Sequence, residues 1–248
     1  MRERIDALLF DFDGTLVDTI ELILDSFRYA TREVLGAALP AEELMRHVGK
    51  PLIKQMRDFT DDEEIAQELL RVYRVYNHAR HDDLAREYPG VEETLAQLKS
   101  RGMPMGIVTS KGRIMTDKGM ERFGIGRYID TVVTADDVDI HKPDPYPVRY
   151  AAELLGVDPL RCAYVGDSPH DMTAAIGAGA VSIAALWGAF PRAAVLKPGP
   201  EFAIEHMADL IELLDDGADR FRADRFGPHA DGNPENLHGV EVRKRREP

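Results

Sequence analysis

The sequence predicts an α/β fold in which a doubly wound parallel sheet carries an inserted all-helical segment. Short apolar runs alternate with helix-like stretches from about residue 86 to residue 185, and such alternation is typical of parallel sheets. Residues 17–85 show helical spacing and no stretch that alternates like a strand. Polar clusters follow several of the apolar runs, and ligands bind at the carboxyl ends of parallel strands. The expected architecture is therefore a Rossmann-like core with a helical insert.

The first strand is expected at residues 5–10, a short buried run that is mostly aliphatic. Two amphipathic helices are expected next, because residues 20–35 and 62–78 place apolar side chains at helical spacing with charged residues between them. These patterns predict the following domains: an α/β core at 1–16 and 86–216, a helical cap at 17–85 and a C-terminal tail at 217–248.

The second half of the chain repeats strand and helix patterns in turn. In order, we expect a helix to residue 100, strand 106–111, a helix beginning at 111–114, strand 131–134, helix 148–155, a strand before Gly166, a helix to 178, strand 181–185 and a last helix at 202–214. The tail has too few apolar residues to form a core, so we expect it to be mobile or to dock on a neighbouring surface.

The composition bounds the kinds of partner. At 248 residues, with 44% hydrophobic and 30% charged residues, the chain can bury one α/β core and a small second lobe. A net charge of −13 argues against a nucleic-acid partner, which requires a basic face. No apolar run approaches the ~20 residues that span a bilayer, so we expect no membrane association. The only cysteine, Cys162, permits no intramolecular disulfide, which favours a cytoplasmic protein.

Asp11 and Asp13 follow the first predicted strand, with one apolar residue between them. Two neighbouring carboxylates repel each other unless a cation or a shared proton relieves the repulsion. Gly14 then permits a tight turn. Because Asp-x-Asp also occurs in solvated turns, the pair indicates a catalytic site only together with other polar clusters.

Three later clusters supply that support. The strand at 106–111 ends in the hydroxyls of Thr109 and Ser110, and Lys142 lies in a proline-stiffened loop at 141–145. The strand before Gly166 leads to Asp167 and, four residues on, Asp171. Carboxylates, hydroxyls and a lysine at one sheet edge are the groups that phosphoryl transfer uses.

These four clusters resemble, in order and spacing, the motifs of the haloacid dehalogenase (HAD) superfamily of phosphohydrolases. The resemblance covers residues 5 to about 190. It implies that Asp11 is the nucleophile that forms an aspartyl-phosphate. It also implies that Asp13 is the general acid that protonates the leaving oxygen and then the base for the hydrolytic water. A carboxylate nucleophile needs no base to activate it.

The resemblance also assigns the phosphate and metal ligands. Thr109 and the Ser110 N–H would bind the transferring phosphoryl oxygens, while Lys142 would neutralise their charge and restrain Asp11. The cofactor would be Mg²⁺, which prefers oxygen ligands. Its implied ligands are the Asp11 and Asp167 carboxylates and the Asp13 carbonyl, with Asp171 as a direct ligand or an orienter of the metal's water shell.

The substrate is expected to be a small soluble phosphate compound. The cap resembles that of the group containing phosphoglycolate phosphatases and a bacterial inorganic pyrophosphatase, and the stretches 18–23, 47–52 and 76–91 look closer to the pyrophosphatase. Lys50, in a turn between cap helices, would suit a second anionic group if it faces Asp11, and Arg46 is a weaker candidate of the same kind. Inorganic pyrophosphate and 2-phosphoglycolate are thus the favoured substrates.

Two alternatives to a phosphatase stay open. An acid at position 13 distinguishes the chain from the dehalogenases and the phosphonate-cleaving branch of the superfamily, but a phosphomutase would keep this residue. A non-catalytic phosphate-binding or regulatory protein is the other alternative, and the complete set of motif residues argues against it.

Overall fold

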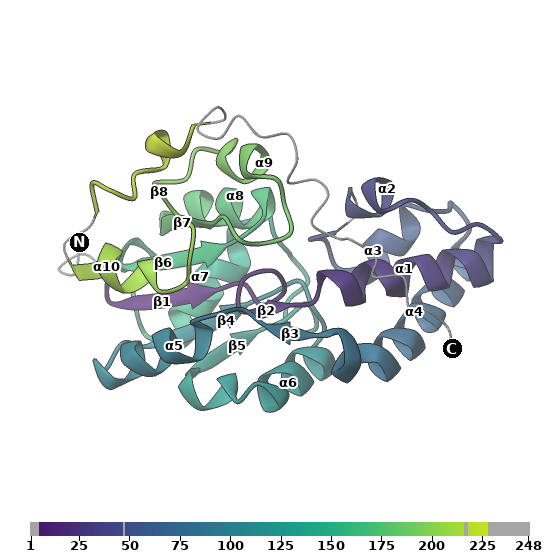
Figure 1. The fold of residues 1–248 in the computed structure, drawn as a ribbon, viewed down its shortest axis with the longest axis horizontal. Coiled ribbons are helices and arrows are strands. Elements are labelled where there is room, and N and C mark those ends of the chain that lie inside the picture. Colours follow the sequence, from purple (N-terminus) through teal and green to yellow (C-terminus); the bar gives the residue numbers. More distant parts are fainter. Residues whose placement is uncertain (1–4, 47, 216–217, 228–248) are drawn as a thin grey trace, which may run out of the picture.

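The computed structural model describes residues 5–46, 48–215 and 218–227. A six-stranded parallel sheet forms the centre of the α/β part, and a group of helices lies beyond one end of its strands (Figure 1). The strands, in the order in which they lie in the sheet, are β5 (Thr131–Val133), β4 (Met105–Val108), β1 (Ala7–Phe10), β6 (Cys162–Gly166), β7 (Val181–Ala185) and β8 (Phe202–Ile204). The predicted doubly wound α/β fold is confirmed.

The first strand, β1, lies in the middle of the sheet between β4 and β6. Leu8 pairs with Met105 on one side and with Ala163 on the other. The chain builds outward from β1 through β4 and β5, and then crosses to β6, β7 and β8. Such a reversal of direction opens a crevice at the carboxyl ends of the central strands. The residues that follow β1 therefore lie where this fold class binds ligands.

Helices cover both faces of the sheet, because side chains of a strand point alternately to opposite sides. Leu8 and Phe10 pack in the cluster that includes helices α5 (Val91–Ser100) and α10 (Asp209–Asp215), whereas Ala7 and Leu9 pack toward α7 (Tyr146–Leu154) and α8 (Pro169–Ala178). The remaining helices of this part are α6 (Arg113–Arg122), α9 (Arg192–Leu196) and three short 3₁₀ turns at Ile125–Tyr128, Pro159–Arg161 and Ala223–Phe226.

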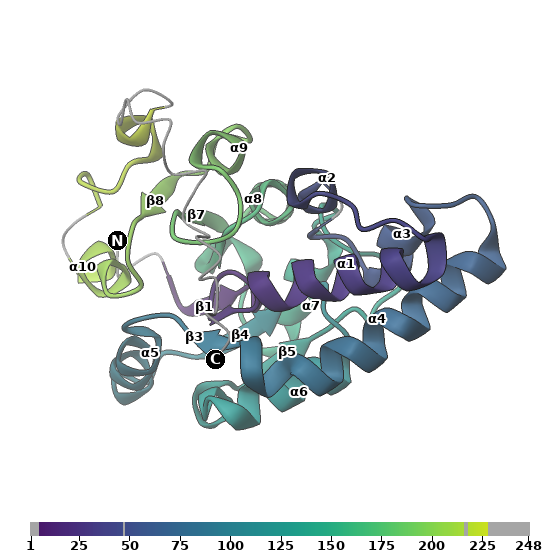
Figure 2. The ribbon, with the colours of Figure 1, turned by 45° about the vertical axis from the view of Figure 1, so that its right-hand side comes forward.

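The described residues of the inserted segment form four helices, α1 (Ile20–Leu35), α2 (Ala41–Met45), α3 (Leu52–Arg57) and α4 (Glu63–Leu84). Figure 2 shows α1 and α4 running side by side. Their facing side chains form a hydrophobic cluster of their own around Phe27, whose ring centroid lies 4.9 Å from that of Tyr73 and 5.7 Å from that of Phe59. The helical insert predicted from the spacing is thus present, and we refer to α1–α4 as the cap.

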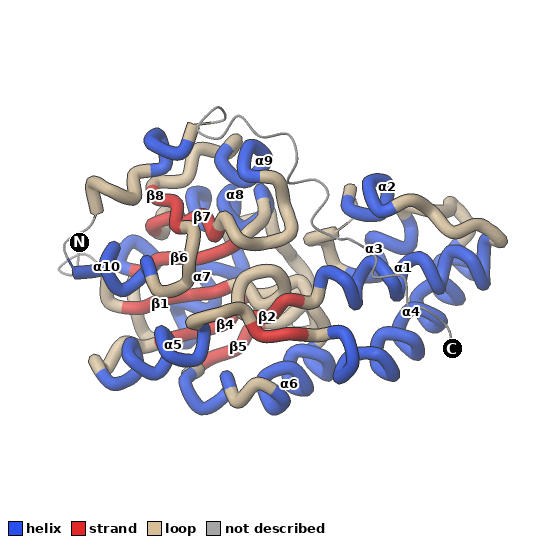
Figure 3. Tube along the Cα trace, in the orientation of Figure 1, coloured by secondary structure: helices blue, strands red, loops and turns tan. Residues whose placement is uncertain are grey.

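A short two-stranded ribbon joins the cap to the sheet (Figure 3). Val17–Asp18 forms β2 and pairs antiparallel with Arg86–Glu87, which forms β3. The sequence predicted no strand between residues 17 and 85, because two residues are too few to display an alternating pattern. The ribbon pairs the segment that enters the cap with the segment that leaves it. The exact domain boundaries stay a prediction.

The predicted helix at 202–214 is wrong in its first part. Phe202–Ile204 forms the edge strand β8, which pairs with β7, and the helix α10 begins only at Asp209. All three residues of β8 are buried. A short, fully apolar run cannot be assigned to strand or helix from periodicity alone, and here pairing with β7 decides it.

The chain continues along the sheet edge beyond the predicted boundary at residue 217. Phe221 is buried in the core, its carbonyl accepts a hydrogen bond from Ala203 N at 2.8 Å, and Arg222 forms a bridge to Phe202. Residues 1–4 of the predicted core and 228–248 of the predicted tail lie outside the described residues. In the part of the chain that is described, no helix is both long and apolar enough to cross a membrane.

We predict that Phe27→Ala destabilises the cap. The Phe27 ring is fully buried, and truncation of a buried Phe to Ala costs about 3–5 kcal/mol through lost burial and the cavity left behind. Urea unfolding followed by circular dichroism would measure the loss. Val75→Ala, at a position 62% exposed on α4, is the matched control and should change stability by less than about 0.5 kcal/mol. Equal effects of the two changes would contradict an independent cap core.

Candidate active site

The loop that follows β1 is held tightly against the sheet. Asp11 N donates to Val165 O of β6 at 2.9 Å, and the Asp11 carboxylate accepts a hydrogen bond from Phe12 N at 2.7 Å. Gly14 has φ of 82°, a conformation that side-chain-bearing residues rarely adopt. The chain therefore turns sharply after Asp11 and leaves its carboxylate at the carboxyl end of the central strand.

Asp167 lies on the other side of this turn, between two glycines. A Cβ at Gly14 would lie 2.3 Å from the Asp167 carboxylate, and a Cβ at Gly188 would lie 2.2 Å from the Asp167 Cβ. Only glycine fits at either position without displacing Asp167. The carboxylate accepts hydrogen bonds from the Thr15 hydroxyl at 3.2 Å and from Ala189 N at 2.9 Å. Asp167 is thus fixed by its packing and by two donors.

Lys142 joins the acidic residues. Its Nζ lies 3.1 Å from Asp11 Oδ1 and 2.6 Å from Asp171 Oδ1, and it also contacts Val108 O at 3.1 Å and the Tyr164 hydroxyl at 2.9 Å. The other Asp171 oxygen accepts hydrogen bonds from the backbone and hydroxyl of Ser168 at the start of α8. All of these groups are buried. The loop lysine predicted to restrain Asp11 therefore lies in direct contact with it.

The carboxylates of Asp11, Asp167 and Asp171 approach within 4.8 Å of one another and can hold a metal ion. Burial, followed by the negative charge of Asp171, raises the pKa of Asp11 to about 7. Burial and the charges of Asp171 and Asp11 also raise the pKa of Asp167 well above its usual range. Burial alone would raise the pKa of Asp171, but the charge and hydrogen bond of Lys142 outweigh burial and lower it.

These shifts have one physical cause: three buried carboxylates share a single buried ammonium. Burial alone would lower the pKa of Lys142, but the adjacent Asp11 and Asp171 outweigh it and raise the pKa. Lys142 therefore stays charged and neutralises only part of the cluster. A bound cation would supply the missing positive charge, so the donor set fits a divalent metal ion with oxygen ligands.

Thr109 and Ser110 directly follow β4, in the short loop that leads to α6. Thr109 is buried, and its Oγ1 accepts a hydrogen bond from Lys111 N at 3.1 Å. The Ser110 hydroxyl is buried without a hydrogen-bond partner among the described residues, and both residues line the same cavity as Asp11. An unpaired buried hydroxyl is costly unless a ligand satisfies it. The position therefore suits an oxyanion.

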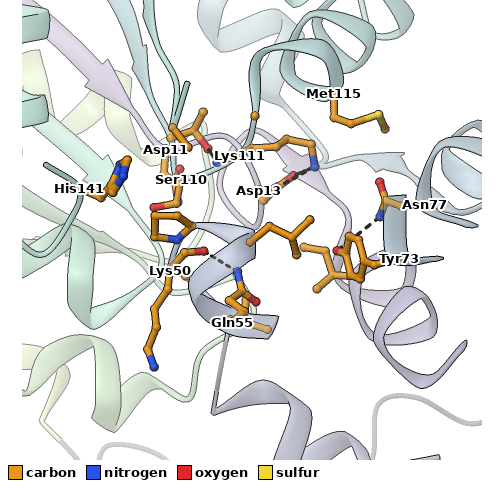
Figure 4. A pocket seen from close by; sticks show the side chains of 18 of the residues that line it. Asp11, Asp13, Lys50, Gln55, Tyr73, Asn77, Ser110, Lys111, Met115 and His141 are labelled. Atoms are coloured by element: carbon orange, nitrogen blue, oxygen red, sulfur yellow. Dashed lines mark hydrogen bonds and ion pairs between the residues drawn. The ribbon is translucent and has the colours of Figure 1, made fainter. Parts of the chain in front are cut away.

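Asp13 is bound by two partners that the sequence did not reveal. Lys111 Nζ lies 2.9 Å from each Asp13 oxygen (Figure 4). The Thr19 hydroxyl donates to Asp13 Oδ1 at 2.7 Å. The Lys111 side chain is 9% exposed. The strand-end sequence Thr-Ser-Lys was the available signal, but it placed Lys111 only at the beginning of a helix.

The cavity above these residues has a volume of about 510 Å³ and is closed on one side by the cap. The cap contributes the amide of Gln55, whose Oε1 is buried without a partner among the described residues while its Nε2 donates to Lys50 O. Tyr73 and Asn77 of α4 also line it, and Asn77 Nδ2 donates to Ser26 Oγ at 3.0 Å. The lining is therefore shared between the core and the cap.

The two cap residues proposed for substrate specificity, Lys50 and Arg46, each form an ion pair with another residue of the cap. Lys50 Nζ forms an ion pair with Asp58 Oδ2 at 2.6 Å, and its side chain points away from Asp11 (Figure 4). Arg46 pairs with Glu42 at 3.1 Å on the exposed surface. The condition under which Lys50 was expected to bind substrate, that it faces Asp11, is not met in this conformation.

The chain is similar to a family of hydrolases and to individual pyrophosphatases. The haloacid dehalogenase-like hydrolase family matches residues 8–185. Pyrophosphatase PpaX of Bacillus velezensis is 38% identical over 211 residues, which cover 85% of this chain and 97% of that protein. Pyrophosphatase PpaX of Bacillus cereus (strain AH820) is 36% identical over 213 residues, which cover 86% and 98%.

Solved structures share the architecture. The crystal structure of a protein from Haemophilus somnus 129PT, described as a predicted phosphoglycolate phosphatase, matches with a TM-score of 0.79 over 85% of this chain and 98% of that chain. The two sequences are 24% identical, so the likeness concerns the fold alone.

We predict that Lys142→Met destabilises the protein by about 3 kcal/mol or more, because removal of one partner leaves the buried Asp11 and Asp171 without their counter-charge. Lys99→Met is the matched control, since Lys99 pairs with Asp130 at the surface and exposed pairs contribute about 1 kcal/mol at most. Denaturant midpoints without added metal would measure both changes. A loss for Lys142→Met no larger than that of the control would contradict the role of Lys142 in the network.

Proposed function

The chain belongs to the haloacid dehalogenase-like hydrolase family, and we propose that it is a Mg²⁺-dependent phosphatase that acts through an aspartyl-phosphate on a small phosphate compound. Inorganic pyrophosphate is the favoured substrate and 2-phosphoglycolate the second candidate. The observation that carries the proposal is the Asp11 carboxylate, which faces the cavity with Lys142 beside it and Asp13 two residues on. The names of the PpaX relatives support the choice of pyrophosphate.

Asp11 is the nucleophile of the proposed reaction. Its oxygen forms a bond to phosphorus while the bond between phosphorus and the bridging oxygen breaks, and the electron pair passes to the bridging oxygen. Asp13 donates a proton to that oxygen. In the second half, Asp13 removes a proton from a water molecule that attacks the aspartyl-phosphate, which releases orthophosphate and regenerates Asp11.

The remaining site residues position the phosphoryl group. Thr109 and Ser110 offer a hydroxyl and a backbone N–H in the loop between β4 and α6, and Lys142 places positive charge beside Asp11. Phosphoryl transfer depends on such positioning and charge neutralisation more than on covalent assistance.

Mg²⁺ would be held by the Asp11 and Asp167 carboxylates and the backbone carbonyl of residue 13. Asp171 would act from outside this set, because its oxygens are already bound by Lys142, Tyr164 and Ser168. When bound, Mg²⁺ supplies positive charge that offsets the carboxylates and the phosphoryl oxygens.

We predict Mg²⁺-dependent release of orthophosphate from inorganic pyrophosphate, 2-phosphoglycolate or both, and none above background for Asp11→Asn. A panel that also contains sugar phosphates and nucleoside monophosphates would be measured by a phosphate assay. A kcat/KM for one substrate well above the rest would identify it. Equal rates for Asp11→Asn and the unmodified protein would contradict the proposal, and activity that requires an added sugar bisphosphate would indicate a phosphomutase.

We predict that Mg²⁺ raises the melting temperature more at about pH 8 than at about pH 5.5. Because the pKa of Asp11 is raised to about 7, the carboxyl stabilises the metal-free fold at low pH and loses that contribution as the pH rises through 7. Below pH 7 the metal must displace a proton from Asp11 in order to bind. For each such proton, the apparent affinity for Mg²⁺ falls about tenfold per pH unit.

Differential scanning fluorimetry with and without Mg²⁺ would measure this. Asp167→Asn should abolish the Mg²⁺-induced shift, whereas Asp13→Asn should keep it, because only the carbonyl of residue 13 is a proposed ligand. An equal shift at both pH values, or loss of the shift in Asp13→Asn, would contradict the assignment.

A further inference from the structure

Lys111 occupies a defined place between the phosphate-binding loop and Asp13. Its N–H donates to Thr109 Oγ1 at 3.1 Å and its carbonyl accepts from Ala135 N at 3.0 Å, so the backbone is fixed on both sides. The side chain alone can move, on a flexible four-carbon stem. Its ammonium contacts both oxygens of Asp13.

This arrangement must change when a substrate binds at Asp11. Asp13 can reach the bridging oxygen of a substrate only if at least one of its oxygens leaves Lys111. A nearly buried ammonium that loses its carboxylate partner is strongly destabilised unless another anion replaces it. The group that arrives at this place in the proposed reaction is the leaving group, next to the bridging oxygen.

The cap adds a second cation on the same side of the cavity. Arg74 of α4 is exposed and lines the cavity together with Lys111, and no ion pair joins it to an acidic residue in the described ranges. Burial, followed by the positive charges of Lys118, Arg74 and Lys111, lowers the pKa of His78, which also lines the cavity. Positive charge thus gathers at this end, whereas the acidic cluster lies around Asp11.

We infer that Lys111 and Arg74 form the subsite for a leaving group that is itself a phosphate, and that Lys111 exchanges Asp13 for this phosphate when the substrate binds. The inference rests on the proposed function and identifies its substrate class as diphosphates. When the bond from phosphorus to the bridging oxygen breaks, the electron pair passes to the leaving phosphate. Lys111 therefore stands where negative charge increases.

The test compares binding of methylenediphosphonate, which has two phosphonates and a non-cleavable bridge, with binding of orthophosphate. Isothermal titration calorimetry with Mg²⁺ would be applied to the unmodified protein, Lys111→Gln and Lys111→Arg. We expect Lys111→Gln to weaken methylenediphosphonate roughly 10- to 100-fold, the range for one hydrogen bond to a charged group, and to weaken orthophosphate less than about threefold. Lys111→Arg should restore most of the affinity, because it keeps the charge.

Two further variants sharpen the comparison. Arg74→Gln should also weaken methylenediphosphonate more than orthophosphate. The loss of affinity should be smaller than for Lys111→Gln, because the Arg74 side chain is more exposed. Lys99→Gln removes one surface charge at a residue outside the cavity lining and should leave both affinities unchanged. Equal weakening of the two ligands by Lys111→Gln, or no weakening of methylenediphosphonate, would overturn the inference.

Kinetics separate this inference from the proposed function. If pyrophosphate is hydrolysed, Lys111→Gln should lower kcat/KM for pyrophosphate roughly 10- to 100-fold and that for glycerol 2-phosphate, whose leaving group is neutral, far less. If the unmodified protein hydrolyses neither these two substrates nor 2-phosphoglycolate, the proposed function fails, while the calorimetric preference for two phosphonates still supports or overturns the subsite.

Discussion

The shortage of buried positive charge at the end of β1 is the constraint on which the rest of the site depends. Asp11, Asp167 and Asp171 are buried together, and Lys142 is the one buried lysine in the described ranges. Buried charges are tolerated only when they are paired and hydrogen-bonded. The surrounding hydrogen bonds, and the glycines at 14 and 188 that make room for Asp167, hold the carboxylates close although their charge is only partly compensated. A protein that keeps such a cluster gains a place for a cation.

The part of the site that could be predicted is the part that the sheet assembles. Asp11, Thr109 and Asp167 each follow a strand, and parallel strands bring their carboxyl ends to one edge whatever the loops do. Strand order and the short loops then leave these side chains little freedom. Lys142 lies in a loop, so only its likeness to a family motif predicted its place, and its four contacts become visible only in the structure.

Long side chains and short strands were less predictable for a physical reason. The direction of Lys50 depends on Asp58 at the far end of α3, and that of Lys111 on Asp13, which is 98 residues away in the sequence. Neither ion pair can be predicted from the local periodicity of the sequence. The strand β8 was missed because three buried apolar residues satisfy a helical and an extended pattern equally, and only pairing with β7 separates them.

The distribution of charge within the cavity also gives the site a direction. Asp11, Asp167 and Asp171, which can hold a metal ion, lie at the sheet edge, whereas Lys111 and Arg74 line the side toward α4. A ligand with one phosphate needs only the first region, but a ligand with a phosphate at each end has a counter-charge available for both. Lys111 is paired with Asp13 in this conformation, and Asp13 is the residue that approaches the bridging oxygen in the proposed reaction. If the second phosphate binds Lys111 as inferred, its binding and the release of Asp13 are one exchange of partners, which links recognition of the leaving group to the proposed cleavage step.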